Sequence, residues 1–482
     1  PVPVVLEEEN VKTLPADIFA KVDRLAAPRL VEYWEQDPCA PPRPERRRRV
    51  RRSTSKATAT SVSRSDKDMG VTVEAQFTVG EYEIVILSAK FSTGLEEWLL
   101  KEKYSIPAGS EEYLRPYVAS GSKFFVAKVN AKKVKFENGR AMLSPLRFHY
   151  ESESFNLPVR LGLMNSKGHQ DLIVHILAQG KRYEVANYPN VTIPTNLDVS
   201  DGMRGRFGEF YAALFDSTLE KNPKAVVTEY SWSAASCDPC PTPPLSWAEL
   251  TTLGYDVVGP QNQVPPPGLT PSPGPMPPRR GRTRSNRIFG SPNSFVLTRL
   301  HARYSKADLG EDLIFREAGA IVGGRERMGS SGKLEASASK GQVNNFQARY
   351  AIRHKWEGKI ECQNPQRGIW GGPPSGQATP ETQPATNLAF ATRGKIQLAS
   401  VVPAGIPELG VTGAAASIAV DEGGSVESDP AVPTPGPKTE APADPGSNKP
   451  SSKEGCSVGG TRAELWLSLL VLGFVFRRRR RK

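Results

Sequence analysis

The sequence is poor in the residues and spacings that catalytic sites require. Its 482 residues include only five histidines and five cysteines, and it contains no HExxH motif, nucleophile elbow or phosphate-binding loop. No repeat of fixed period is found. The composition, with 38% hydrophobic and 24% charged residues, is typical of a globular protein and excludes a collagen-like or wholly disordered chain. We therefore expect a folded protein that is not an enzyme and that holds no metal or cofactor.

The positive charge of the chain is concentrated in short runs. A net charge of +12 would suggest a nucleic-acid or anionic-membrane partner. However, residues 43–56, 279–287 and 477–482 carry net charges of +7, +5 and +6, so the remainder of the chain is mildly acidic. Such runs are typical of solvated linkers, and the first contains no aromatic residue on which a base could stack. We expect no specific nucleic-acid partner, and polyanion binding through these runs is kept as an alternative.

Alternating apolar residues predict more strands than helices. The strands are expected at 71–77, 82–87, 124–130, 146–150, 159–163, 172–178, 183–186, 225–232, 295–304, 314–317, 346–354 and 394–402. The helices are expected at 14–25, 95–103, 111–119, 207–220 and 247–253. The helix at 207–220 has the most regular apolar stripe, which we interpret as core. Because few strands alternate with helices, the sequence predicts an α+β, mainly β fold with antiparallel-rich sheets and a few helices.

Composition also divides the chain into segments. Two stretches rich in Pro, Arg, Ser and Gly lack apolar periodicity and are predicted to be disordered linkers. The predicted segments are an N-terminal segment at 1–39, a basic linker at 40–69, a folded ectodomain in two parts at 70–258 and 293–402, a Pro/Arg-rich insertion at 259–292, a flexible spacer at 403–455, and a C-terminal hydrophobic helix within 456–482. The chain opens with Pro1 in what resembles the interior of a strand, so we expect that the natural start and its signal peptide are missing.

The carboxyl end carries the most specific pattern in the chain. Cys456 is followed by an apolar run, 465–476, and then by six cations. As a helix this run would be about 18 Å long, against roughly 30 Å for the hydrocarbon core of a bilayer. The cations are expected to stay on the cytoplasmic side, which leaves the rest of the chain outside. The expected membrane residues are Leu465, Trp466, Leu467, Leu469, Leu470, Val471, Leu472, Phe474, Val475 and Phe476.

This arrangement of spacer, Gly-Cys step, short apolar segment and arginine-rich tail resembles the C-terminal sorting signals of bacterial surface proteins, most closely the MYXO-CTERM type. The resemblance implies that a sorting protease cleaves near Cys456 and that Cys456 is the processing and lipid-attachment residue. It also implies a protein that is anchored in the membrane of the cell envelope and faces the outer surface.

Several stretches of the body resemble an uncharacterised family of bacterial envelope proteins, domain of unknown function 2330. These stretches are Leu114–Val118, Lys123–Val129, Leu143–Tyr150, Leu157–Gly162, Ala186–Val191, Phe295–Arg303, Tyr350–His354 and Trp370–Pro374. The resemblance covers roughly residues 1–402 outside the two linkers. It implies a compartment but no reaction, because the family has no established activity.

Four cysteines precede the anchor: Cys39, Cys237, Cys240 and Cys362. In an oxidising envelope this even number suggests disulfides. Cys237 and Cys240 have the C-x-x-C spacing of redox dithiols and of half a zinc site, but no second such pair is present and the motif leads into prolines rather than a helix. A structural disulfide is therefore favoured, either within the motif or with the other cysteines.

The remaining polar motifs are interpreted as structural. His149 and His175 are expected to fill hydrogen-bonded strand positions, and the oxygen-rich stretch 196–202 is expected to be a polar turn because it does not fit the EF-hand register. The leading hypothesis is a secreted, envelope-anchored structural or binding module whose ligand is unknown. The alternative is an envelope enzyme, either a thiol oxidoreductase that uses Cys237 and Cys240 or a metal-dependent hydrolase that uses His149 or His175.

Overall fold

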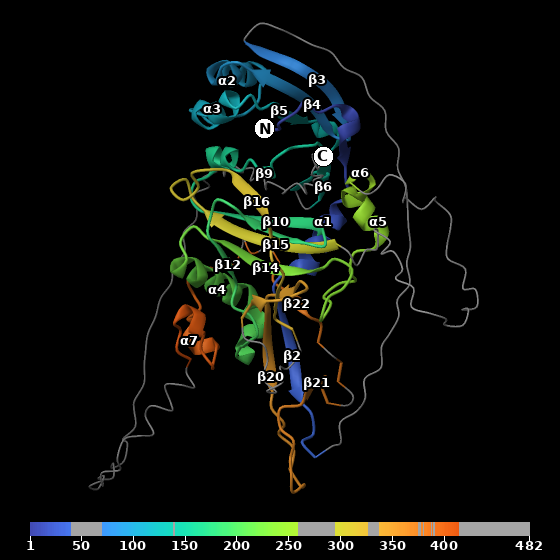
Figure 1. The fold of residues 1–482 in the computed structure, drawn as a ribbon, viewed down its shortest axis with the longest axis vertical. Helices are drawn as coiled ribbons and strands as arrows, with labels where there is room; N and C mark the ends of the chain where they lie inside the picture. Colours follow the sequence, from blue (N-terminus) through green and yellow to red (C-terminus); the bar gives the residue numbers. More distant parts are fainter. Residues whose placement is uncertain are drawn as a thin grey trace, which may run out of the picture.

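The computed structural model describes residues 1–39, 70–137, 140–258, 295–325, 337–374, 377–378, 380–386, 388 and 391–413. Three tiers of sheets follow one another along the long axis of the molecule (Figure 1). The predicted α+β, mainly β fold with antiparallel-rich sheets is confirmed. Both expected linkers, most of the expected spacer and the segment 456–482 with its apolar run lie outside the described residues. Within the part of the chain that is described, no helix is both long and apolar enough to cross a bilayer.

The first tier, at the top of Figure 1, is an antiparallel sheet of order β3-β4-β5 with two helices. Its elements are β3 (Val71–Val79), β4 (Tyr82–Ala89), β5 (Phe124–Val129), α2 (Ser92–Lys101) and α3 (Glu111–Ala119). Alternate residues of β4 enter two different cores: Val85 and Leu87 pack with the helices, while Ile84 and Ile86 pack with the N-terminal segment. Because both faces of β4 are covered, this strand is almost continuously apolar.

The second tier is a seven-stranded sheet of order β10-β15-β14-β19-β17-β18, with a further strand, β12, paired to β14. Its strands are β10 (Gln170–Gln179), β15 (Phe295–Tyr304), β14 (Val226–Ser233), β19 (Asn345–Gln347), β17 (Ile321–Gly323), β18 (Ser339–Lys340) and β12 (Asn190–Thr192). β14 and β15 are buried along nearly their whole length. Polar side chains in these two strands must therefore find partners inside the protein.

The third tier, at the bottom of Figure 1, is a five-stranded sheet built around the parallel pair β2 and β20. Its strands are β2 (Arg29–Glu35), β20 (Arg349–His354), β13 (Leu197–Asp198), β21 (Trp370–Gly371) and β22 (Gln383–Pro384). Helix α4 (Phe207–Lys221) packs here, and its apolar stripe joins the core around Tyr350. The interpretation of that stripe as core is confirmed.

A bend in one chain segment joins the second and third tiers. Only Ala348 separates β19, in the seven-stranded sheet, from β20, in the five-stranded sheet. Its backbone N–H donates to the carbonyl of Glu229 at 2.9 Å. The pairing of β14 with β15 shifts register between Thr228 and Tyr230, so Glu229 is the extra residue of a β-bulge. Bulges redirect side chains, and this one places the Glu229 carboxylate in the buried centre of the molecule.

Smaller elements complete the described structure. They are η1 (Glu8–Asn10), β1 (Val11–Thr13), α1 (Ala16–Ala26), η2 (Ala131–Lys133), β6 (Lys135–Glu137), β7 (Arg140–Met142), β8 (Leu146–Phe148), β9 (Asn156–Leu157), η3 (Arg160–Asn165), β11 (Arg182–Val185), η4 (Asp201–Arg206), α5 (Trp247–Leu250), η5 (Thr251–Tyr255), α6 (Asp256–Val258), β16 (Leu313–Ala318), α7 (Leu398–Val401) and η9 (Pro407–Leu409). β1 pairs with β8, and β11, β16 and β9 form a three-stranded antiparallel sheet.

Some expected elements differ from the structure. The predicted strand at 159–163 is the 3-10 helix η3, and the predicted strand at 394–402 contains α7 instead. Both are short apolar runs, whose periodicity does not separate strand from helix. Packed structure also continues past residue 402, because Ile406 is fully buried and bridges to Val411. Residues 403–413, which were expected to open the spacer, therefore contain packed structure.

Candidate functional site

The most concentrated charge in the interior surrounds Glu229. Its carboxylate accepts hydrogen bonds from Arg299 Nε at 2.5 Å, Tyr211 Oη at 2.5 Å and His301 Nδ1 at 2.6 Å. All four residues are at most 1% exposed. Burial alone would raise the pKa of Glu229, but the His301 and Arg299 charges outweigh it and lower the pKa to about 2. Glu229 is therefore a buried anion surrounded by hydrogen-bond donors.

His301 lies between two carboxylates. Its Nε2 atom is 3.1 Å from Asp171 Oδ1, on the side opposite Glu229, and its ring stacks on Phe215 with centroids 3.9 Å apart. Burial alone would lower the pKa of His301, but Glu229 and Asp171 outweigh that effect and raise it. The geometry thus favours an imidazolium that donates to both neighbours.

Further ion pairs close the network around this centre. Asp171 accepts from Arg303 at 2.5 Å and from Arg393 at 3.2 Å, and Arg299 also pairs with Asp23 of α1. Burial and the Arg299 charge lower the pKa of His175 to about 3, so its neutral ring faces Arg299 at 3.3 Å. Each carboxylate oxygen of Glu229 and Asp171 already accepts a hydrogen bond from a neighbouring side chain. We therefore assign this network a structural role.

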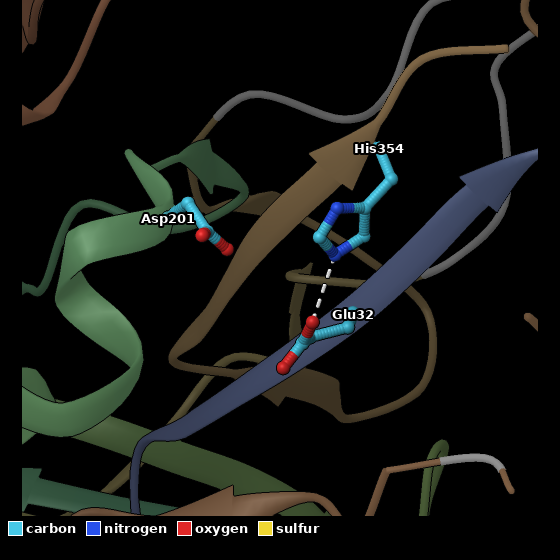
Figure 2. Close-up of side chains that lie close together, drawn as sticks. All are labelled: Glu32, Asp201 and His354. Atoms are coloured by element: carbon cyan, nitrogen blue, oxygen red, sulfur yellow. Dashed lines mark hydrogen bonds and ion pairs between the residues drawn. The ribbon is translucent and has the colours of Figure 1, made fainter. Parts of the chain in front are cut away.

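A second polar cluster lies at the surface of the third tier. Glu32 on β2, Asp201 on η4 and His354 on β20 bring their candidate ligand atoms within 4.8 Å of one another (Figure 2). His354 Nε2 is 2.8 Å from Glu32 Oε2, and the His354 ring stacks on Trp34. This is the one group of metal-compatible side chains among the described residues.

An arginine already donates hydrogen bonds to both carboxylates of this cluster. Arg204 donates from Nε and Nη2 to the two oxygens of Glu32 at 2.7 and 2.8 Å, and from Nη2 to Asp201 at 2.6 Å. These bonds lower the pKa of Glu32, and His354 adds to the effect. Imidazole and carboxylate suit Zn²⁺ as ligands, but an incoming cation would have to displace the guanidinium. The donor set fits a metal only in part.

An open groove of about 820 Å³ runs beside this cluster. Its lining includes Arg24, Glu32, Trp34, Arg204 and Pro241, so it combines an aromatic ring with charges of both signs. Pro241 directly follows the C-x-x-C motif. The groove therefore connects the surface cluster with the loop that contains Cys237 and Cys240.

The four predicted disulfide cysteines form two bonds in the structure. Cys39 pairs with Cys362, with 5.6 Å between their Cα atoms, and Cys237 pairs with Cys240, with 4.9 Å. The sequence left the pairing open, and in the structure the two cysteines of the C-x-x-C motif pair with each other. Cys456, the fifth cysteine, lies outside the described residues, as do the apolar run 465–476 and the three basic runs.

Within the described part of the chain, none of the other histidines joins a group of metal-compatible side chains. His149 is part-buried and contacts Asn10, while His175 lies in the buried network. The stretch 196–202, predicted to be a polar turn, contributes Asp201 to the surface cluster, and this cluster was not predicted from the sequence. Glu229 and Arg299 were also missed, although charged residues inside the otherwise apolar strands 225–232 and 295–304 are a signal of buried ion pairs.

The fold and these sites define a disulfide-bonded, mainly β protein of the α+β class whose core is organised by ion pairs. The chain belongs to the family described as uncharacterized protein conserved in bacteria (DUF2330), which matches residues 1–316. Comparisons with curated proteins and with solved structures gave no match.

Proposed function

We propose that the protein is a secreted binding or structural module, held at the outer surface of the cell envelope by its C-terminal segment, and that it is not an enzyme. The Cys39–Cys362 disulfide carries this proposal. It links the end of β2 to the segment after β20, residues separated by 323 positions in the sequence. Disulfides of this kind persist in oxidising compartments and are rare in the cytosol.

The surface that we assign to ligand binding is the groove beside β2. Trp34 offers an apolar ring, while Arg204 and Glu32 offer hydrogen-bonding groups close to it. A few polar groups placed next to apolar surface are typical of small-ligand sites. This combination suits a ligand with both an apolar face and hydroxyl groups, such as an envelope polysaccharide.

The location is tested by fractionating host cells that produce the full chain with a tag in the ectodomain. We expect the protein in the envelope fraction, with all four ectodomain cysteines resistant to alkylation until a reductant is added. The mass of the mature C-terminus should end near Cys456. Recovery in the soluble cytosol with free thiols would contradict the proposed compartment, and retention of Lys482 would contradict processing.

The binding role is tested separately, by co-sedimentation of the purified protein with isolated envelope polysaccharide. We expect Trp34→Ala to reduce the bound fraction. Phe91→Ala is the matched control, because Phe91 is a large aromatic side chain that is 67% exposed and does not line the groove. Equal binding by the wild type and both variants would exclude the groove as the binding surface.

A further inference from the structure

The two sulfur atoms of the C-x-x-C disulfide lie in different surroundings. Cys240 is exposed, whereas Cys237 is partly buried and packs against the core cluster that contains Trp232, Ala234 and Leu245. Because Pro241 lines the groove, Cys240 lies next to a concave surface. We propose that the Cys237–Cys240 disulfide is a reversible redox site that dithiols open by attack on Cys240, and that opening it releases the loop from the core. This goes beyond the proposed function.

The loop between these cysteines is held by two buried side chains. Arg29 Nη1 donates to the Pro239 carbonyl at 2.7 Å, and Gln347 Nε2 donates to the Asp238 carbonyl. Arg29 and Gln347 are both 0% exposed. Burial lowers the pKa of Arg29 to about 10, which leaves a cation at neutral pH. The disulfide loop therefore supplies carbonyl oxygens to a buried guanidinium and a buried amide.

Each of the two side chains also has a partner outside the loop: Arg29 Nη2 donates to the Leu25 carbonyl at 2.7 Å, and Gln347 Nε2 donates to the Gly324 carbonyl at 2.8 Å. Arg29 Nε and Gln347 Oε1 have no hydrogen-bond partner among the described residues, and Arg29 lies over the Tyr230 ring at 5.5 Å. A buried cation is stable only while its hydrogen bonds are made. Loosening the loop would therefore remove one hydrogen bond each from Arg29 and Gln347 at the junction of the second and third tiers, where Arg29 pairs in register with Arg349, while their bonds to Leu25 and Gly324 remain.

The exchange step balances without any further reactant. A thiolate of the external dithiol attacks Cys240 Sγ, which forms a mixed disulfide and releases Cys237 as a thiolate. The second thiol of the dithiol then attacks the sulfur that the dithiol contributes to the mixed disulfide, and Cys240 is released as a thiolate. The dithiol is oxidised to a disulfide, and the protein gains two electrons and two protons.

The fold can lose this bond more easily than the other one. A disulfide stabilises a protein mainly by restricting the unfolded chain, and the effect grows with the length of the closed loop. Cys237 and Cys240 are three positions apart, whereas Cys39 and Cys362 are 323 apart. Neither Cys39 nor Cys362 is fully exposed. Opening the short bond should leave the three tiers folded.

The test is graded reduction of the full, folded chain with dithiothreitol, followed by alkylation and peptide mass spectrometry. We expect Cys237 and Cys240 to be labelled at about one-tenth of the dithiothreitol concentration that labels Cys39 and Cys362. After selective reduction, amide hydrogen exchange of peptides that cover 234–245 should accelerate while circular dichroism stays unchanged. Simultaneous reduction of both bonds would refute the redox site, and unchanged exchange would refute loop release.

Paired variants test which sulfur is attacked. Cys237→Ser leaves Cys240 free, and Cys240→Ser leaves Cys237 free. We expect the free Cys240 to react with an aromatic disulfide reagent at least about tenfold faster than the free Cys237, because only Cys240 is exposed. Equal rates, or a faster Cys237, would overturn the assignment of Cys240. If either variant does not fold, graded reduction of the wild type decides the proposal by itself.

Discussion

Replacing Glu229 by glutamine tests whether the buried network is a stabilising centre. The two side chains have nearly the same shape, so the substitution removes the charge and leaves the packing. Glu229 accepts from Arg299, Tyr211 and His301, and all three donors are buried. Removing one partner of a buried ion pair leaves the other charge uncompensated and costs about 3–5 kcal/mol. Because a domain is stable by only about 5–15 kcal/mol, Glu229→Gln should remove a large part of the free energy of unfolding.

The assay is urea unfolding at pH 7, followed by circular dichroism and tryptophan fluorescence. Glu317→Gln is the matched control, because Glu317 pairs with Lys181 at the surface, where the two side chains are 42% and 56% exposed. Exposed pairs contribute about 0–1 kcal/mol. A change in midpoint without a change in the slope against urea would show that stability, rather than compactness, has changed.

The refuting result is a Glu229→Gln protein whose free energy of unfolding lies within about 1 kcal/mol of the wild type and matches that of the control. That outcome would mean that Arg299 is adequately compensated by Asp23 and that His301 is neutral. The role assigned to the buried network would then be wrong.

Other expectations can be checked independently. The stability that Glu229 contributes is fully present above its ordinary pKa of 4.5 and is lost as the pH falls towards its folded value of about 2. The urea midpoint should therefore drop less between pH 5 and pH 3 in Glu229→Gln than in the wild type. Replacing both Cys39 and Cys362 by serine should lower the free energy of unfolding by about 2–5 kcal/mol, measured by urea unfolding. Arg204→Ala should increase the affinity for Zn²⁺, measured by calorimetry, because it frees both carboxylates of the surface cluster. Adding His354→Ala should abolish the gain. Equal Zn²⁺ affinity in the wild type and Arg204→Ala would contradict this explanation.

The sequence predicted elements whose periodicity reflects burial on one side. Helix α4 and strand β3 lie close to their predicted positions, because a regular apolar stripe or alternation marked each of them. Strand β2 was missed although it is central to its sheet. It follows helix α1 closely, and its consecutive buried residues do not alternate because both faces are covered. At β2, burial on two faces therefore removed the alternation that marks β3.

The candidate sites were harder to predict because they depend on distant contacts. Glu32 and His354 are 322 positions apart and meet only because β2 and β20 pair in parallel. Glu229 and Arg299 are 70 positions apart, and a bulge rather than the regular register aims Glu229 inwards. Cysteine spacing, by contrast, carried usable information, since Cys237 and Cys240 are close in any fold.

The Cys39–Cys362 bond has a consequence for proteolysis. A protease that cuts the backbone once between these residues produces two polypeptides that stay covalently joined. The strand β2 on one piece and β20 on the other would also remain hydrogen-bonded to each other. A nicked molecule would therefore keep its mass on a non-reducing gel and separate into two bands only after reduction.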